Sequence, residues 1–191
     1  MSWFNSGSTS IESPRDGLDY APNRFWIPSG QNREMVFVDF VNGHFKEHQA
    51  KINGNWRNWI TCLGPLMEAN EVAPCCNALG SDDAYNVSML TVVDCSKWTD
   101  KKGTSHQYEL KIYPAKYKTV QKLVGKNKRQ IDDGRGPMTG KLYRVVRETD
   151  KSPAVGDEFE YIRDIDSTKL FDVVIYQGKK LSEHFALAEQ D

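Results

Sequence analysis

The alternation of apolar and polar positions predicts a chain built mainly of β-strands. Residues 34–40 are apolar on both faces, which indicates a central strand of a curled sheet. Two pairs, Asn42-Gly43 and Asn53-Gly54, are strong signals for tight hairpin turns. They flank a return strand at residues 45–52, and the second turn introduces another strand at residues 55–62. The first part of the chain is therefore predicted to be three strands joined by short turns.

The second half of the chain predicts further strands and one short helix. Alternating patterns occur at residues 85–94, 107–113, 139–147 and 158–162. Pro114 ends the second of these strands and suits the start of a helix at residues 115–124, with Gly125 as its stop. A flexible loop is predicted for residues 126–137 and a further strand for residues 170–176.

These elements predict a mainly β fold with one short helix. About five strongly bent strands, with the helix between the third and the fourth, suit a Greek-key barrel of the oligonucleotide-binding (OB) type, and a β-sandwich stays open as the alternative. A single OB-type domain is predicted for residues 24–181, with residues 63–83 as an inserted loop module that contains cysteines. The composition predicts a flexible arm at residues 1–23 and an acidic tail at residues 182–191.

The charges are segregated along the chain. The formal net charge is only -1, but residues 97–147 hold 14 Lys and Arg against 4 Asp and Glu, and the remainder is correspondingly acidic. A uniformly solvated surface does not require such a separation. The basic residues are interleaved with aromatic residues, a combination that neutralises phosphates and stacks unpaired bases.

This combination predicts a sequence-tolerant binder of single-stranded DNA, and the alternative is a solvated hairpin with ordinary core aromatic residues. The candidate DNA-binding residues are Trp56, Arg57, Trp59, Lys97, Trp98, Lys101, Lys102, Lys111, Tyr113, Lys116, Lys118, Arg144 and Arg147. Tyr113 and Lys111 are expected to share the binding face, whereas Tyr108 is expected in the core.

Four cysteines, Cys62, Cys75, Cys76 and Cys95, are read as thiols or metal ligands rather than as a disulfide framework. His48, Cys62, Cys75 and Cys76 lie on either side of the inserted loop, which a zinc ion could organise. The spacing is unusual for zinc because two of the cysteines are adjacent and no Cys-x-x-Cys occurs. A thiol cluster without metal is the alternative.

Catalytic motifs are weak in this sequence. There is no Gly-x-Ser-x-Gly, phosphate-cradling glycine loop or His-Glu-x-x-His, so the chain is predicted not to be an enzyme. Two alternatives stay open. A metal-dependent nuclease acting on single-stranded DNA is motivated by the paired aspartates Asp82-Asp83, Asp132-Asp133 and Asp164-x-Asp166. A zinc-module interaction adaptor is motivated by the cysteines. With no run of about 18 apolar residues and no signal-peptide pattern, a cytosolic protein without a membrane partner is expected.

Several blocks, in the same order, carry a family resemblance. They are Arg24-Phe25-Trp26-Ile27-Pro28, Glu47-His48, Asn53-Gly54-Asn55-Trp56-x-Asn58-Trp59-x-Thr61-Cys62, Val93-Asp94-Cys95-Ser96-Lys97-Trp98-x-x-Lys101-x-Gly103, Pro114-Ala115-Lys116-Tyr117 and Ser152-Pro153-x-Val155-Gly156-Asp157-x-Phe159. From about residue 24 to residue 162 the chain resembles bacteriophage single-stranded DNA-binding proteins of the OB-fold type.

The resemblance implies a protein that coats and protects single-stranded DNA during phage replication, recombination and repair, in the cytoplasm of the infected bacterial host. It also implies that the acidic C-terminal tail recruits replication or recombination proteins. Some members of this family carry what looks like a zinc ribbon with a Cys-x-x-Cys after the tryptophan block. This chain departs from that pattern at Cys75-Cys76, and no cofactor is required for the predicted function.

Overall fold

The computed structural model describes residues 24–39, 43–52, 55–68, 71–79, 84–99, 103–176 and 178–180, and for residues 43–45, 51–52 and 55–59 it describes the backbone alone. The predicted N-terminal arm and acidic tail lie outside the described residues. Within the described residues, no helix is both long and apolar enough to cross a membrane.

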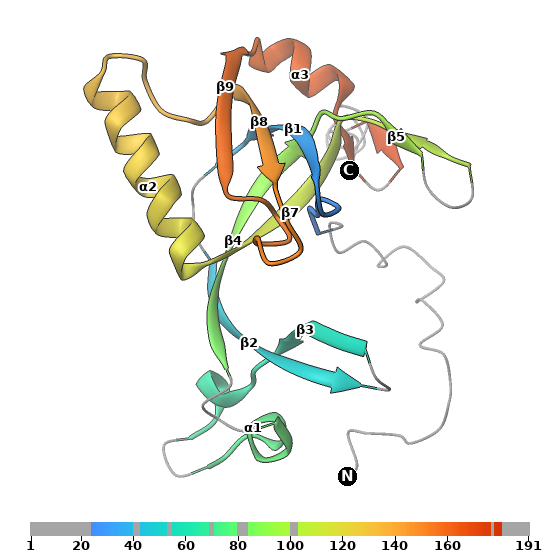
Figure 1. The fold of residues 1–191 in the computed structure, drawn as a ribbon, viewed down its shortest axis with the longest axis vertical. Helices are drawn as coiled ribbons and strands as arrows, with labels where there is room; N and C mark the ends of the chain where they lie inside the picture. The colour runs from blue at the N-terminus through green and yellow to red at the C-terminus, as the bar shows by residue number, and fades with distance from the viewer. Residues whose placement is uncertain are drawn as a thin grey trace, which may run out of the picture.

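The centre of the fold is a large mixed sheet, which confirms the prediction of a mainly β chain. Five of its strands run in the order β7-β4-β1-β8-β9, as Figure 1 shows. Their bounds are β1 (Gln31–Phe37), β4 (Tyr85–Asp94), β7 (Glu109–Lys116), β8 (Lys141–Arg147) and β9 (Glu158–Asp164). Each neighbouring pair in this order is antiparallel.

A second unit of the sheet extends away from these five strands. Strand β2 (Gly43–Ile52) pairs with β3 (Asn55–Thr61) and also with the first half of β4. The inserted module that follows β3 contains the short 3-10 helix η1 (Gly64–Leu66) and helix α1 (Pro74–Leu79). Figure 1 shows this unit below the central sheet, with the long strand β4 running through both.

The main core lies between the central strands and helix α2 (Tyr117–Asp132). Tyr113 is fully buried there, its ring 5.7 Å from those of Phe25 and Phe37, and its hydroxyl donates a hydrogen bond to the Gly156 carbonyl at 2.9 Å. The prediction that Tyr113 stacks on DNA bases is therefore wrong, because both the ring and the hydroxyl are used inside the protein.

Helix α2 is longer than the sequence predicts. It continues through Gly125 into the segment expected to be a flexible loop. Gln130 explains the extension, since its side chain is buried, accepts a hydrogen bond from the Tyr143 hydroxyl at 2.6 Å and donates one to the Pro137 carbonyl at 3.2 Å. These tertiary contacts outweigh the cost of roughly 1 kcal/mol for a glycine inside a helix.

Strand β7 also differs from the prediction, because it runs through Pro114 to Lys116. At Pro114 the strand pairs with Met89 of β4. On its other side, β7 pairs with β10 at Glu109 and forms a parallel bridge with Arg24 at Ile112. Both pairings end before Pro114, where a missing N–H is tolerated.

The remaining elements are short. Helix α3 (Ser167–Val173) replaces most of the strand predicted at residues 170–176, because Asp166 caps its first turn by accepting from the N–H groups of Thr168 and Lys169. The other strands are β5 (Trp98–Thr99), β6 (Ser105–His106), β10 (Ile175–Tyr176) and β11 (Lys179–Lys180).

We predict that Gly156→Ala costs about 2–4 kcal/mol of unfolding free energy, because it combines backbone strain with overpacking. Gly156 has a φ of +73°, and a Cβ there would lie 2.7 Å from Val145 Cγ1 and 2.8 Å from the Val146 carbonyl oxygen. Gly30→Ala is the matched control, since Gly30 has a φ of +72° with no atom within 4 Å. Urea denaturation of both variants measures the difference, and equal losses would contradict the packing argument.

Candidate functional site

A groove of about 630 Å³ lies where β2, β4 and β7 meet the segment before β1 and the turn after β8. Its walls carry three aromatic and four basic residues: Phe25, Trp26, Tyr85, Arg24, Lys116, Arg147 and Lys151. The extended segment before β1 buries Phe25 and Ile27 almost completely and leaves Trp26 54% exposed. Because successive residues of an extended chain point to opposite sides, the core contacts of Phe25 and Ile27 turn the indole of Trp26 outward.

The groove carries more positive than negative charge. Its acidic lining residues are Glu47 and Asp150, against four basic ones. The buried carboxylate of Glu47 forms an ion pair with Arg24. The lining of the groove as a whole is therefore suited to an anionic ligand.

Lys116 and Tyr85 form a pair within the groove. The Lys116 ammonium lies 4.0 Å from the centre of the Tyr85 ring, in cation–π contact. Burial lowers the pKa of Lys116 from its ordinary value, and Glu47 opposes this. Burial, followed by the nearby Glu47 carboxylate, raises the pKa of Tyr85 to about 12. Tyr85 therefore keeps its proton at neutral pH and can donate it in a hydrogen bond.

Arg147 connects two of the segments that line the groove. Its Nη1 donates a hydrogen bond to the Ile27 carbonyl at 2.9 Å, and its Nη2 donates one to the Asp150 carbonyl at 3.2 Å. These bonds tie the turn after β8 to the segment that presents Trp26. Arg147, predicted to contact a phosphate, lines the groove, and the prediction did not anticipate these two internal bonds.

The other predicted DNA-binding residues are dispersed. Lys97 and Lys118 are exposed outside the groove lining, and Arg144 forms ion pairs with Glu160 at 3.1 Å and Glu34 at 3.7 Å. The residues whose side chains or whole positions lie outside the described part of the chain are Trp56, Arg57, Trp59, Lys101 and Lys102.

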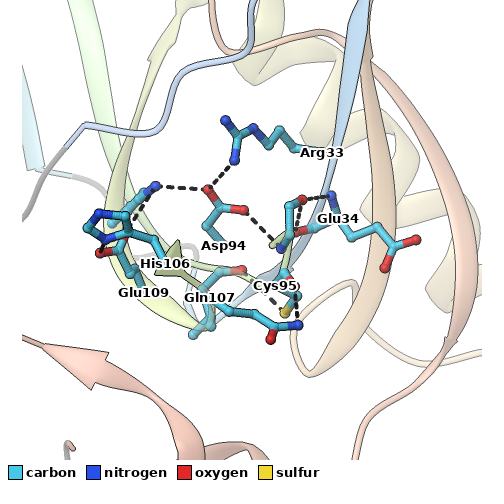
Figure 2. Close-up of polar contacts among 10 residues, drawn as sticks. Arg33, Glu34, Asp94, Cys95, His106, Gln107 and Glu109 are labelled. Carbon is cyan, nitrogen blue, oxygen red and sulfur yellow. Dashed lines mark hydrogen bonds and ion pairs between the residues drawn. The ribbon is translucent and has the colours of Figure 1, made fainter. Parts of the chain in front are cut away.

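Lys111 is buried, which contradicts its predicted role at a phosphate. Its ammonium lies 2.8 Å from Asp94 Oδ2 and 3.2 Å from Glu109 Oε2, and Asp94 is itself only 1% exposed. Arg33 approaches the same carboxylate at 3.5 Å. Figure 2 shows this charged cluster, with Asp94 between Arg33 on one side and His106 and Glu109 on the other.

Trp98 belongs to the same cluster. One side of its ring system stacks on His106 at 4.3 Å, and the Lys111 ammonium and the Arg33 guanidinium lie 4.8 Å and 5.4 Å from the ring centre. Trp98 is half-buried and occupied by internal partners, so it anchors the β5–β6 hairpin. Tyr108, expected in the core, is half-buried and packs against a smaller apolar cluster that includes Val36, Val93 and Leu142.

The four predicted metal-ligating residues converge. The donor atoms of His48, Cys62, Cys75 and Cys76 all lie within 4.8 Å of one another, although they come from three separate places in the sequence. Cys62 Sγ is 3.4 Å from Cys76 Sγ, which is 3.6 Å from His48 Nε2. Both adjacent cysteines lie in the first turn of α1, and both contribute a sulfur atom to the cluster. This cluster could hold a metal ion.

The thiols of the cluster have different acidities. Burial opposes ionisation of Cys75, but hydrogen bonds from the Leu63 N–H and from the Cys76 and Cys62 thiols outweigh it and lower the Cys75 pKa. The hydrogen bond with Cys62 and then burial raise the pKa of Cys76 to about 11. Cys95 lies elsewhere, and burial, followed by the charge of Asp94, raises its pKa to about 12.

No protein-family model and no curated protein sequence matches the chain.

Sequence reasoning did not select Trp26, Tyr85 or Lys151 as site residues. The first and last of these lie in irregular segments, outside the alternating patterns on which the prediction of a binding surface rested. Trp26 does fall within one of the blocks that carry the family resemblance, which was the available signal.

We predict that Cys75 is alkylated first and Cys95 last when the reduced protein, held in a metal chelator at pH 7, is treated briefly with iodoacetamide. The reactive species is the thiolate, which a lowered pKa favours and burial with a raised pKa suppresses. Peptide mass spectrometry after short exposures gives the order. Labelling of Cys95 as fast as Cys75 would contradict the assigned environments.

Proposed function

We propose that the chain is a sequence-tolerant, non-enzymatic single-stranded DNA-binding protein that uses the groove as its binding surface. The observation that carries the proposal is the exposed Trp26 ring in a groove bordered by Arg24, Lys116 and Lys151. An aromatic face accepts any unpaired base, and the basic side chains meet the phosphates on either side. In a duplex the base faces are stacked inside, so the same groove favours a single strand.

The arrangement of strands supports an OB-type barrel for this protein. The order β7-β4-β1-β8-β9, with α2 between the third and fourth strands in sequence, is the arrangement that this fold uses. Tyr113 of β7 and Phe159 of β9 pack at 6.5 Å, which brings the two ends of the strand order together.

The proposal includes the biological role that the resemblance implies. The protein would coat transient single strands during phage replication and recombination in the cytoplasm of the infected host. The acidic tail at residues 182–191, outside the described residues, would recruit other replication proteins.

The paired aspartates give no specific support to a nuclease. Asp166 caps α3, Asp164 accepts a hydrogen bond from Lys141 at 2.6 Å, and Asp133 pairs with Arg135 at 3.7 Å. These carboxylates have local structural partners, and Asp82-Asp83 lies outside the described residues.

We further propose that the ion held by the cysteine module is zinc. In a tetrahedral zinc site with bonds of about 2.3 Å to sulfur and 2.0 Å to nitrogen, neighbouring ligand atoms lie roughly 3.5–3.8 Å apart. The separations of 3.4 Å from Cys62 to Cys76 and 3.6 Å from Cys76 to His48 are close to this range. His48 would bind through Nε2, and its Nδ1 is buried without a hydrogen-bond partner in the described part of the chain.

The packing of the module also favours a metal. Neither η1 nor α1 contains a buried residue, so apolar burial contributes little to holding them in place. A zinc ion would fix both against β2 and β3, as metals do in other small modules that lack a core of their own.

We predict that the purified protein binds mixed-sequence single-stranded DNA more tightly than duplex, with an affinity that falls as salt rises. Trp26→Ala should weaken binding by about 1–3 kcal/mol through loss of a stacked base, and Lys151→Gln should reduce the salt slope by about 0.7. Fluorescence anisotropy of labelled oligonucleotides measures both effects. Tyr161→Ala, which removes an exposed ring of β9 outside the groove lining, is the control. Equal affinity for duplex, or Trp26→Ala binding like wild type, would refute the groove assignment.

We predict that the protein purified under reducing conditions contains one zinc ion per chain. Cys62→Ser or Cys76→Ser should remove most of this zinc, and Cys95→Ser, which changes a buried thiol outside the cluster, should retain it. Elemental analysis gives the stoichiometry, and the absorption of a cobalt-substituted sample reports thiolate ligation. Absence of zinc, or an equal loss in Cys95→Ser, would contradict the site.

A further inference from the structure

The groove contains an acidic residue where a site for a polyanion should avoid one. Glu47, on β2, lines the groove and is only 2% exposed. A carboxylate in this position repels phosphate groups, and its burial alone is unfavourable unless it is paired. The presence of Glu47 in the groove therefore needs an explanation other than direct attraction of the ligand.

Glu47 organises three of the side chains that line the groove. Its Oε1 accepts from Arg24 Nη2, and its Oε2 accepts from the Tyr85 hydroxyl at 3.5 Å. The ring of Tyr85 in turn lies 4.0 Å from the Lys116 ammonium. One buried carboxylate on β2 thus begins a series of contacts that runs through Tyr85 of β4 to Lys116 at the end of β7.

The physical advantage of this arrangement is preorganisation. Arg and Lys side chains have many rotamers, and ordering them at the moment of binding costs conformational entropy. Side chains that are already held by Glu47 and Tyr85 lose less freedom when a ligand arrives. The favourable ordering opposes the unfavourable repulsion between Glu47 and a phosphate, and the two effects have opposite signs on affinity.

We propose that Glu47 is a positioning residue that preorganises Arg24, Tyr85 and Lys116 for an anionic nucleic-acid strand. This inference rests on the proposed function of the groove and adds an acidic residue whose removal weakens binding. Glu47 itself touches no phosphate.

Glu47→Gln is the sharpest test, because the two effects predict opposite results. Glutamine keeps an acceptor for the Tyr85 hydroxyl and removes the charge that holds Arg24. If the carboxylate only repels phosphates, Glu47→Gln binds single-stranded DNA more tightly than wild type. If it positions the groove, the variant binds roughly 2- to 12-fold more weakly, since the long side chain of Arg24 must be ordered again on binding.

Asp150→Asn is the matched control. Asp150 also lines the groove, but it is exposed and its described hydrogen bond uses the backbone carbonyl, which the substitution keeps. Loss of this charge should tighten binding of an oligonucleotide by removing repulsion. In the double variant Arg24→Gln with Glu47→Gln, affinity should be no weaker than in Arg24→Gln alone. Tighter or unchanged binding by Glu47→Gln, or fully additive losses in the double variant, would overturn the proposal.

A second measurement tests the same contacts without DNA. Loss of the Glu47 charge should lower the pKa of Tyr85. An absorbance titration detects the phenolate, and the difference between proteins with and without Tyr85→Phe gives the contribution of Tyr85. A lowered pKa in Glu47→Gln, with no DNA affinity in wild type, would retain the positioning role and reject the proposed function. An unchanged Tyr85 pKa would reject the positioning role whether or not the protein binds DNA. Circular dichroism of each variant shows that these comparisons are made between folded proteins.

Discussion

The register of strand β4 is the constraint on which the rest of the structure depends. Its first half pairs with β2, its second half pairs with β1, and β7 pairs along its length. Because side chains alternate along a strand, a slip of one residue would exchange the core face and the outer face in all three pairings. Tyr85 at one end of β4 would leave the groove, and Asp94 at the other end would leave its ion pairs with Lys111 and Arg33.

The ion pairs at the Asp94 end explain how β4 is held in register. A carboxylate that is 1% exposed is stable only when basic partners face it, and these come from β1 and β7, the strands on either side. The same requirement removes Lys111 from the surface. A lysine that local pattern assigns to a phosphate is needed to neutralise a buried charge, so the charge segregation along the chain serves the fold as well as any ligand.

The pattern of apolar and polar residues located most of the strands. It was less successful in showing which of their side chains are buried in the core. The pairing of β2 with β3, in which Ile52 lies opposite Asn55, and the long strand at residues 85–94 follow from residue type and spacing. The hairpin predicted at Asn42-Gly43 is wrong, because β1 pairs with β4 and β8 whereas β2 pairs with β3 and β4. His48 and the three cysteines were selected by residue type, although the spacing of the cysteines is unusual for zinc. The length of α2, the passage of β7 through Pro114 and the burial of Tyr113 depend on contacts made by Gln130, β4 and Gly156. Those partners are distant in sequence, so alternation and turn signals carry no information about them. The groove was missed for the same reason, because irregular segments form two of its walls.

Strand β2 connects the two candidate sites most directly. Glu47 and His48 are consecutive, so their side chains leave opposite faces of the strand, one toward the groove and the other toward the thiol cluster. The backbone N–H of Cys62 bonds to the Lys46 carbonyl at 2.8 Å, which ties the start of the cysteine module to the same strand. Whatever fixes His48 and Cys62 also fixes the backbone that carries Glu47. The cysteine module therefore acts as a support for one wall of the groove, even though its sulfur atoms lie on the other side of the sheet.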